Sequence, residues 1–325
     1  MYIVKMLLVG FFLVGIVFLS TAIYFVLTPA TKVTSEANVF GFSASYQQPA
    51  DLPELRRFKA RDGSQLAYRF YDSTSEKQLF FFHGSSYHSV AYHALAQAIS
   101  SSGLAKVYMP NLRGHYLSGV RRGDVDYIGQ LEDDIADLIS FARDQGEKAE
   151  IYLGGHSSGA GLAIRFAGGK YADVVNGYVL LAPVIPLAPS VKGGDAGGWA
   201  NVNQNRLYGL LALNAVGISG FNGLPIIEFN KPEKFWDGTE TLSYSYRLNT
   251  SYHPRYDYVS DITLMGDKVL VLVGEEDEAI DTGKLKALFE DATSGIEVAI
   301  LPGVNHFGIF TDPSAFKAIR SLFEK

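Results

Sequence analysis

The segment IYLGGHSSGAGLAI, residues 151–164, combines a short apolar run, a turn rich in glycine and a second apolar run. This composition predicts a buried strand, a tight turn and a helix, with Ser157 at the apex of the turn. The turn matches the pattern G-x-S-x-G, in which a strained strand-to-helix turn exposes a serine hydroxyl. The pattern therefore predicts that Ser157 is a nucleophile, and the remaining sequence can be searched for the groups that such a serine needs.

Length and composition indicate a globular protein. The 325 residues can bury one large core or two modest ones. The net charge is -6 and the cationic residues are scattered, so the basic surface of a nucleic-acid-binding protein is missing. Cysteine is absent, which excludes disulfides, thiolate chemistry and Cys-type zinc sites, and no histidine and carboxylate pair has the spacing of H-E-x-x-H. The sequence predicts neither a metal nor a cofactor.

A membrane anchor is predicted within residues 1–30. Residues 6–27 carry no charge, and about 22 residues in a helix can cross a bilayer core about 30 Å thick. The alternative is a cleaved signal peptide, but the apolar core of such a peptide is only about 7–15 residues long. Lys5 and the chain amine precede the segment, which favours insertion with the catalytic domain on the extracytoplasmic side. Lys32 follows the segment and weakens this preference without reversing it.

The rest of the chain is predicted to be a linker (residues 31–54) and one α/β domain (residues 55–325). Runs with strand character occur at residues 66–71, 78–82, 105–109, 151–153, 177–183, 268–274 and 297–301. Amphipathic helices are expected between them, among them residues 90–101, 284–291 and 313–323. This alternation predicts a mostly parallel sheet with helices on both faces. Residues 185–262 break the alternation and are predicted to form an inserted cap, whose aromatic side chains mostly form core, with a few lining an acyl pocket.

Three polar residues follow strands in the order serine, acid, histidine. They are Ser157, Asp277 and His306. The carboxyl ends of parallel strands meet at one edge of a sheet, so we expect these side chains to lie close together. A serine hydroxyl needs a base to remove its proton, and a carboxylate that orients the imidazole completes the set. Asp261 is an alternative to Asp277 as the acid.

At this point the chain resembles the α/β-hydrolase superfamily, in which nucleophile, acid and base occur in this order, each after a strand. The runs HGSS (83–86), NLRGH (111–115) and GHSSG (155–159) resemble the lysophospholipase, monoacylglycerol lipase and serine aminopeptidase-like group. One departure is Asn111, where that group has Asp. The resemblance implies an oxyanion hole formed by the backbone amides of Ser85 and Ser158, with Ser86 as the neighbouring alternative to Ser85. His83 and His115 are expected to fix loops near the site.

Three functions are compatible with these residues. The first is a membrane-anchored serine hydrolase that cleaves carboxylic esters of lipid or acyl substrates through an acyl-enzyme on Ser157. The second is a serine aminopeptidase or amidase with the same triad, which would need a cap carboxylate for the substrate amine. The candidates for that carboxylate are Glu228, Glu233, Asp237 and Glu240. The third is a catalytically silent binding protein on a hydrolase fold, although no position of the triad is substituted. The acyl length and the oligomeric state stay open.

Overall fold

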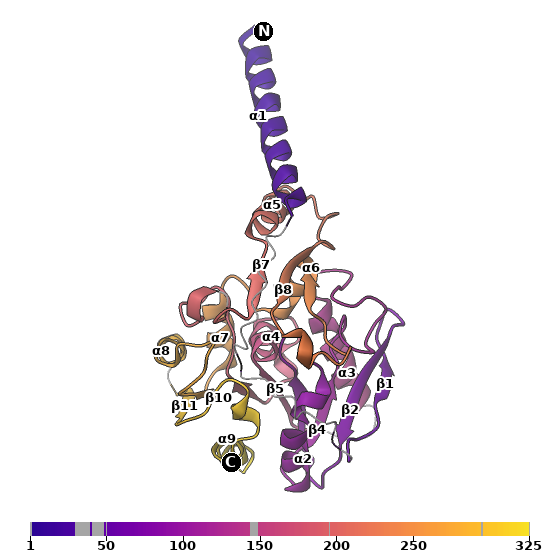
Figure 1. Cartoon of the computed structure of the whole chain (residues 1–325), viewed down its shortest axis with the longest axis vertical. Coiled ribbons are helices and arrows are strands. Elements are labelled where there is room, and N and C mark those ends of the chain that lie inside the picture. Colours follow the sequence, from indigo (N-terminus) through magenta and orange to yellow (C-terminus); the bar gives the residue numbers. More distant parts are fainter. Residues whose placement is uncertain are drawn as a thin grey trace.

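The computed structural model describes residues 2–29, 40, 49, 51–143, 149–194, 196–293 and 295–324. Its centre is an eight-stranded sheet with the strand order β1-β2-β4-β3-β5-β6-β10-β11 (Figure 1). The pairs β1/β2 and β2/β4 are antiparallel and all other neighbours in the sheet are parallel. The mostly parallel sheet that the sequence predicts is thus confirmed.

The sheet strands coincide with the predicted runs to within a few residues, except for β1. Their bounds are β1 (Arg56–Lys59), β2 (Gln65–Tyr71), β3 (Gln78–Phe82), β4 (Lys106–Pro110), β5 (Ile151–His156), β6 (Gly177–Leu181), β10 (Val269–Gly274) and β11 (Glu297–Leu301). Every residue of β3, β5, β6 and β10 is buried, because helices cover both faces of these central strands. In β1 only Phe58 is buried, so this edge strand has no apolar run that could reveal it.

Two groups of helices cover the sheet. Their bounds are α2 (His93–Ser101), α3 (Gln130–Arg143), α4 (Ser158–Ala167), α7 (Tyr258–Met265), α8 (Thr282–Ala292) and α9 (Pro313–Phe323). α2 packs against α9, whereas α4 packs against α7, which in turn contacts α8. α2 is shorter than predicted because a 3-10 turn (Ser89–Tyr92) precedes it.

Between β6 and β10 the chain leaves the sheet and forms the cap. Its elements are β7 (Ala200–Val202), α5 (Gln204–Ala215), β8 (Pro225–Phe229), β9 (Ser243–Ser245) and α6 (Tyr246–Tyr252). The strands form a separate three-stranded antiparallel sheet. Two of these strands have only three residues, too few for a hydrophobic period, which explains why the sequence shows no regular pattern here. The predicted end of the cap, near residue 262, falls inside α7.

The N-terminal helix α1 (Tyr2–Leu27) projects from the domain beside α5 (Figure 1). It is long and apolar enough to cross a membrane, with a mean hydropathy of 2.6 in its most apolar window. Most of its side chains are exposed, but Ala22 and Val26 near its end are buried where α1 packs against α5. Most of the predicted linker, residues 31–54, lies outside the described residues.

Candidate active site

Ser157 occupies the turn between β5 and α4. Its backbone has φ 57° and ψ -122°, a conformation that is strained for any residue with a side chain. The turn can form because its flanking residues are glycines: a Cβ on Gly155 would lie 2.3 Å from the carbonyl carbon of Gly159, and a Cβ on Gly159 would lie 2.2 Å from the carbonyl oxygen of Phe82. Both glycines of the G-x-S-x-G pattern are therefore required by backbone contacts, and the strain directs Ser157 away from the sheet.

Asp277 and His306 lie against each other at the same edge of the sheet. Asp277 Oδ2 is 2.7 Å from His306 Nδ1, and both residues are buried. Asp277 Oδ1 accepts hydrogen bonds from the amides of Ala279 (2.8 Å) and Ile280 (2.9 Å). Both carboxylate oxygens thus have hydrogen-bond partners, and the bond to Nδ1 orients the imidazole of His306.

Asp261, the alternative acid, lies elsewhere. It belongs to α7 and forms an ion pair with Arg255 at 2.9 Å. The geometry therefore pairs the imidazole of His306 with Asp277 and not with Asp261.

His156 connects the serine turn to His306. Its Nε2 donates to the carbonyl oxygen of His306 at 2.9 Å, and the centroids of the two rings are 4.7 Å apart. Because Nε2 carries the ring proton, Nδ1 accepts from the hydroxyl of Tyr92 at 3.0 Å, and that hydroxyl accepts from the amide of Gly84 at 2.8 Å. Burial holds the pKa of His156 well below its usual range, so the ring stays neutral. Among the described residues, Ser157 Oγ forms no hydrogen bond with His306, as is common without substrate.

The loop after β3 presents the amides that the resemblance assigns to the oxyanion hole. The amides of Gly84 and Ser86 donate to the hydroxyls of Tyr92 (2.8 Å) and Tyr244 (2.7 Å). Within the described part of the chain, the amides of Ser85 and Ser158 donate to no acceptor. Because the amide of Ser86 is already used, the geometry favours Ser85 over Ser86 as an oxyanion donor.

Two cap tyrosines hold this loop from the other side. The hydroxyl of Tyr244, which accepts from the Ser86 amide, lies 2.7 Å from His115 Nε2. Burial lowers the pKa of His115 to about 4, so its ring is neutral and Nε2 can accept from Tyr244. The hydroxyl of Tyr252 donates to the carbonyl oxygen of His83, whose Nε2 accepts from the amide of Leu112 at 3.0 Å. His83 and His115 thus connect loops, as the sequence analysis expects.

Phe40, an aromatic residue beside the histidine, was missed by sequence reasoning. Phe40 is buried, and its ring stacks on the ring of His306 with centroids 4.9 Å apart and planes 17° apart. It also contacts the rings of Trp199 (5.3 Å) and Phe307 (5.0 Å). Trp199 Nε1 donates to Ser85 Oγ at 3.0 Å. Phe40 precedes the folded domain in a stretch without any hydrophobic period, so no sequence signal could place it here.

The four cap carboxylates considered for an amine-binding site are all either paired or exposed. Glu240 Oε1 is bound to Lys231 Nζ at 2.5 Å, and Oε2 accepts from the amide of Gly238. Asp237 accepts from the amide and hydroxyl of Thr239. The remaining two candidates, Glu228 and Glu233, are exposed. None of the four is both buried and unpaired. Among the described residues, no group of three or more His, Asp or Glu could hold a metal ion.

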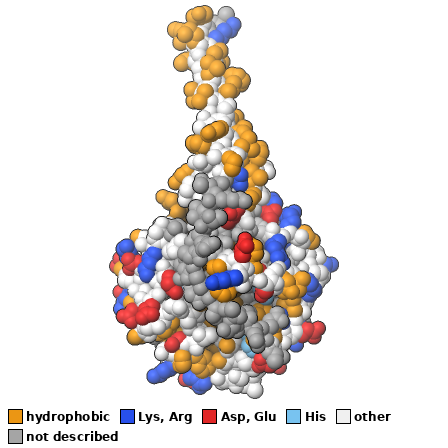
Figure 2. Space-filling view, in the orientation of Figure 1, with side chains coloured by type: hydrophobic (Ala, Val, Ile, Leu, Met, Phe, Trp, Pro, Cys, Tyr) orange, Lys and Arg blue, Asp and Glu red, His pale blue; other side chains and the backbone are white. Residues whose placement is uncertain are grey.

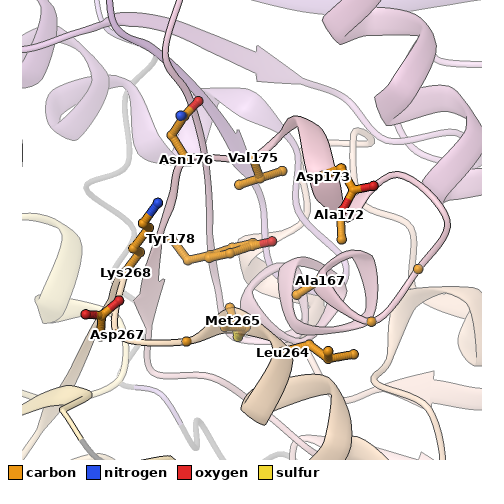
Figure 3. Close-up of a pocket in the computed structure, with 13 residues that line it drawn as sticks. Ala167, Ala172, Asp173, Val175, Asn176, Tyr178, Leu264, Met265, Asp267 and Lys268 are labelled. Atoms are coloured by element: carbon orange, nitrogen blue, oxygen red, sulfur yellow. The ribbon is translucent and has the colours of Figure 1, made fainter.

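A hollow of about 480 Å³ lies away from these residues (Figure 3). Tyr178, Asn176 and Lys268 line it together with Ala167 and Met265. It lies where β6 and β10 begin, whereas Ser157 and Asp277 follow the ends of β5 and β10. The hollow is thus at the opposite edge of the sheet from the candidate active site.

Comparisons with known proteins agree with this architecture. The monoglyceride lipase of Saccharomyces cerevisiae superposes with a TM-score of 0.63 over 86% of this chain and 96% of that chain, at 19% identity. The chain thus has the α/β-hydrolase fold. The chain is also similar to an esterase of Thermogutta terrifontis (TM-score 0.56, 20% identity, 83% and 98% covered) and to a monoacylglycerol lipase of Paleococcus ferrophilus (TM-score 0.56, 21% identity, 80% and 97% covered).

The sequence itself matches a family model described as serine aminopeptidase, S33, over residues 73–216. No curated protein matches it. The family is one of hydrolases, which supports a hydrolase activity for this α/β hydrolase. The matched region includes Ser85, Ser157 and Ser158 but ends before Asp277 and His306, so the case for the last two rests on the geometry described above.

Proposed function

We propose that this α/β hydrolase is a membrane-anchored serine hydrolase that cleaves carboxylic esters of acyl or lipid substrates. The observation that carries the proposal is the buried Asp277–His306 pair beside the strained turn of Ser157. Nucleophile, base and acid come from three different loops at one sheet edge. Burial of a carboxylate costs more free energy than burial of an apolar side chain at the same place. The arrangement therefore favours a chemical role over a purely structural one.

In the proposed reaction, His306 Nε2 takes the proton of Ser157 Oγ as the oxygen attacks the ester carbonyl carbon. The amides of Ser85 and Ser158 hold the oxyanion of the tetrahedral intermediate. When the intermediate collapses, the C–O bond to the alcohol breaks and the imidazolium returns its proton to the alcohol. Water then attacks the acyl-enzyme with His306 again as base, which releases the carboxylic acid and restores Ser157. Asp277 orients His306 through Nδ1 and stabilises the imidazolium.

An ester substrate is favoured over a peptide by the surroundings of His306. A free amino group would need an unpaired carboxylate, and the four cap candidates are paired or exposed. The residues beside the imidazole are instead apolar and aromatic, namely Phe40, Trp199 and Phe307. Such a wall suits an acyl chain. The aminopeptidase alternative keeps support from the family match over residues 73–216.

The proposed anchor is α1, with the catalytic domain on the extracytoplasmic side. A helix of this hydropathy, with Lys5 as its only charged residue, suits retention in the bilayer. Protease added to intact cells should digest the domain if this orientation is correct. Protection until the cells are lysed would place the domain in the cytoplasm, and release of a shortened soluble protein would identify α1 as a cleaved signal.

The activity is tested by hydrolysis of p-nitrophenyl esters of increasing acyl length beside aminoacyl arylamides. We expect turnover of the esters, labelling by a fluorophosphonate probe, and loss of both in Ser157→Ala, because no other group is proposed to form the acyl-enzyme. Faster turnover of the arylamides would favour the aminopeptidase alternative. Equal labelling of the wild type and Ser157→Ala would remove Ser157 as the nucleophile, and the absence of any turnover would favour a silent binding protein.

A further inference from the structure

The cap helix α5 and the turn that follows it carry a surface that the chain itself leaves uncovered. Large apolar side chains are exposed at Tyr208 (59%), Leu211 (47%), Val216 (53%), Ile218 (36%) and Phe221 (39%). Residues 207–227 contain no charged side chain. Isolated exposed apolar residues are ordinary, but a run of them in an uncharged stretch is typical of a surface that contacts something else.

The same helix is joined to the end of α1. A Cβ on Gly209 would lie 2.7 Å from the carbonyl oxygen of Ala22 and 2.8 Å from the amide of Val26, so the two backbones touch only because residue 209 is a glycine. Arg206 Nε donates to the carbonyl oxygen of Val26 at 2.9 Å, and Asn203 Nδ2 donates to that of Thr28 at 3.1 Å. These bonds satisfy carbonyls at the C-terminal end of α1, where a cation also complements the helix dipole.

The length of α1 sets where this joint lies relative to a bilayer. The residues of α1 before Ala22, about 20 in number, extend about 30 Å as a helix, which equals the hydrocarbon thickness of a typical bilayer. Lys5 lies within one turn of the outer end of this span, where its long side chain can reach the headgroups. Figure 2 shows hydrophobic side chains along this projecting helix and a cation close to its tip. If the part before Ala22 spans the hydrocarbon, the contact between α1 and α5 falls at the membrane surface.

We propose that α5 and the following turn, residues 204–221, form a membrane-contact surface whose partner is the lipid boundary next to α1. This proposal rests on the proposed anchoring of α1. Residues 207–221 carry no charge, which fits the boundary between headgroups and acyl chains, and Tyr208 is a residue type enriched there. Arg206, the one cation of the surface, is bound to the end of α1. An interface with a second protein usually has a rim of charged and polar side chains. Residues 207–227 contain no charged side chain that could form such a rim. The joint at Gly209 then fixes the cap, and with it the active site, at a set height above the bilayer.

The natural absence of cysteine makes a direct test possible in the full chain. Ile218→Cys, labelled with an environment-sensitive fluorophore, is reconstituted into phosphatidylcholine nanodiscs with and without lipids that carry a nitroxide near the headgroup. Leu264→Cys on α7, where the native side chain is 68% exposed, is the matched control. We expect blue-shifted emission at position 218 and at least twofold stronger quenching there than at position 264. Equal quenching would overturn the proposal, as would blue-shifted emission that nitroxide lipids leave unquenched and that grows with protein concentration, which would indicate a second copy.

The joint is tested by adding Gly209→Ala to the Ile218→Cys chain, with Gly220→Ala as its control. The added Cβ collides with α1 at position 209 but meets nothing within 4 Å at position 220. We expect Gly209→Ala to reduce lipid quenching about twofold and Gly220→Ala to leave it unchanged. An unchanged signal in both would overturn the role of the joint. Hydrolysis of a water-soluble ester, measured on the same samples, separates the two proposals: quenching without hydrolysis would refute the esterase and keep the membrane surface.

Discussion

The edge of the main sheet and the tip of the cap, residues 204–221, differ in the burial of their side chains: polar groups are buried at the sheet edge, whereas apolar groups are exposed at the cap tip. At the sheet edge, Asp277, His306 and His156 are buried polar groups whose partners all belong to the chain. At the cap tip, Leu211 and Phe221 are apolar and exposed. Burying polar groups is possible only where hydrogen bonds compensate the lost water, so the sheet edge is structurally complete in itself. The cap tip leaves apolar surface exposed, and we propose that the lipid boundary covers it.

Substitution of the buried carboxylate should have the largest effect. Asp277→Asn is expected to lower kcat by about 10⁴-fold, because an amide cannot hold the required tautomer of His306 or stabilise its cation. Asp261→Asn is the matched control, since it changes another buried carboxylate that pairs with Arg255 and not with His306. It should leave kcat within about twofold of the wild type after titration of active sites with a fluorophosphonate. Near-normal turnover in Asp277→Asn together with a large loss in Asp261→Asn would reverse the assignment of the acid.

The sequence could predict most of the fold and the three candidate catalytic residues, but it could not decide between Asp277 and Asp261. Ser157 and Asp277 each follow a strand that is continuously apolar because helices cover both of its faces, so both the strand and the residue after it could be predicted. His306 follows the edge strand β11, whose short apolar run was also recognisable. The fold class followed from the same alternation. The choice between Asp277 and Asp261 needed the structure, because both are acidic residues close to β10 in the sequence: Asp261 lies in the helix before this strand and Asp277 in the loop after it.

The partners from outside the sheet could not be predicted. Phe40, Trp199 and Tyr244 reach the site from the N-terminal segment and the cap, where strands are short and no period survives. Their contacts depend on tertiary packing alone. The same holds for Gly209, which allows α1 to approach α5 closely. No local sequence pattern predicts this contact.

Acid should lower the free energy of unfolding of the protein through histidines that are buried near the sheet edge; the exposed cap tip has no such group among residues 207–227. Burial lowers the pKa of His88 and of His115 to about 4, whereas both would titrate near 6.5 in the unfolded chain. Below pH 6.5 the unfolded chain therefore binds protons that the folded chain does not, and the free energy of unfolding falls by about 1.4 kcal/mol per pH unit for each histidine until the folded-state pKa is reached. At pH 5 the two together should cost about 4 kcal/mol.

The measurement is urea unfolding in detergent at pH 7, 6 and 5, compared with His88→Gln. His88 Nε2 lies 3.0 Å from the hydroxyl of Thr239, a contact that an amide can keep. The variant should show a shallower dependence on pH, because one of the histidines whose pKa is lowered by burial is gone. Unfolding midpoints that do not change between pH 7 and pH 5 would contradict the depressed pKa values.

Removal of a tyrosine hydroxyl should lower stability and kcat near the sheet edge but not at the cap tip, and the effect should be smaller than that of Asp277→Asn. Tyr244→Phe leaves the amide of Ser86 and the ring nitrogen of His115 without a partner in a buried place. We expect the free energy of unfolding to fall by about 1–3 kcal/mol. We also expect kcat to fall by about 10-fold, less than the loss of a whole oxyanion donor, because the loop that carries Ser85 is loosened and not removed. Tyr208→Phe at the exposed tip deletes the same hydroxyl and should change neither Tm nor kcat. A loss of stability without any change of kcat would show that Tyr244 has no part in positioning the loop.

The smallest effect is expected from Phe40, where the N-terminal segment meets the site. Its ring stacks on His306 and contacts Trp199 and Phe307, so Phe40→Ala should open a space beside the imidazole. Esters that fill this space should gain relative to smaller ones, by about 5-fold or more in the ratio of kcat/KM, since even one methylene in a hydrophobic pocket is worth about 10-fold. Two series of esters, one varied in the acyl chain and one in the alcohol, will reveal which group lies there. A ratio measured on one sample is independent of the fraction of active enzyme, so partial unfolding cannot imitate the effect. Phe316→Ala on α9 deletes the same ring away from the site and should leave both ratios unchanged. If Phe40→Ala likewise changes neither series, Phe40 covers the histidine without touching the substrate, and the active site is complete without the N-terminal segment.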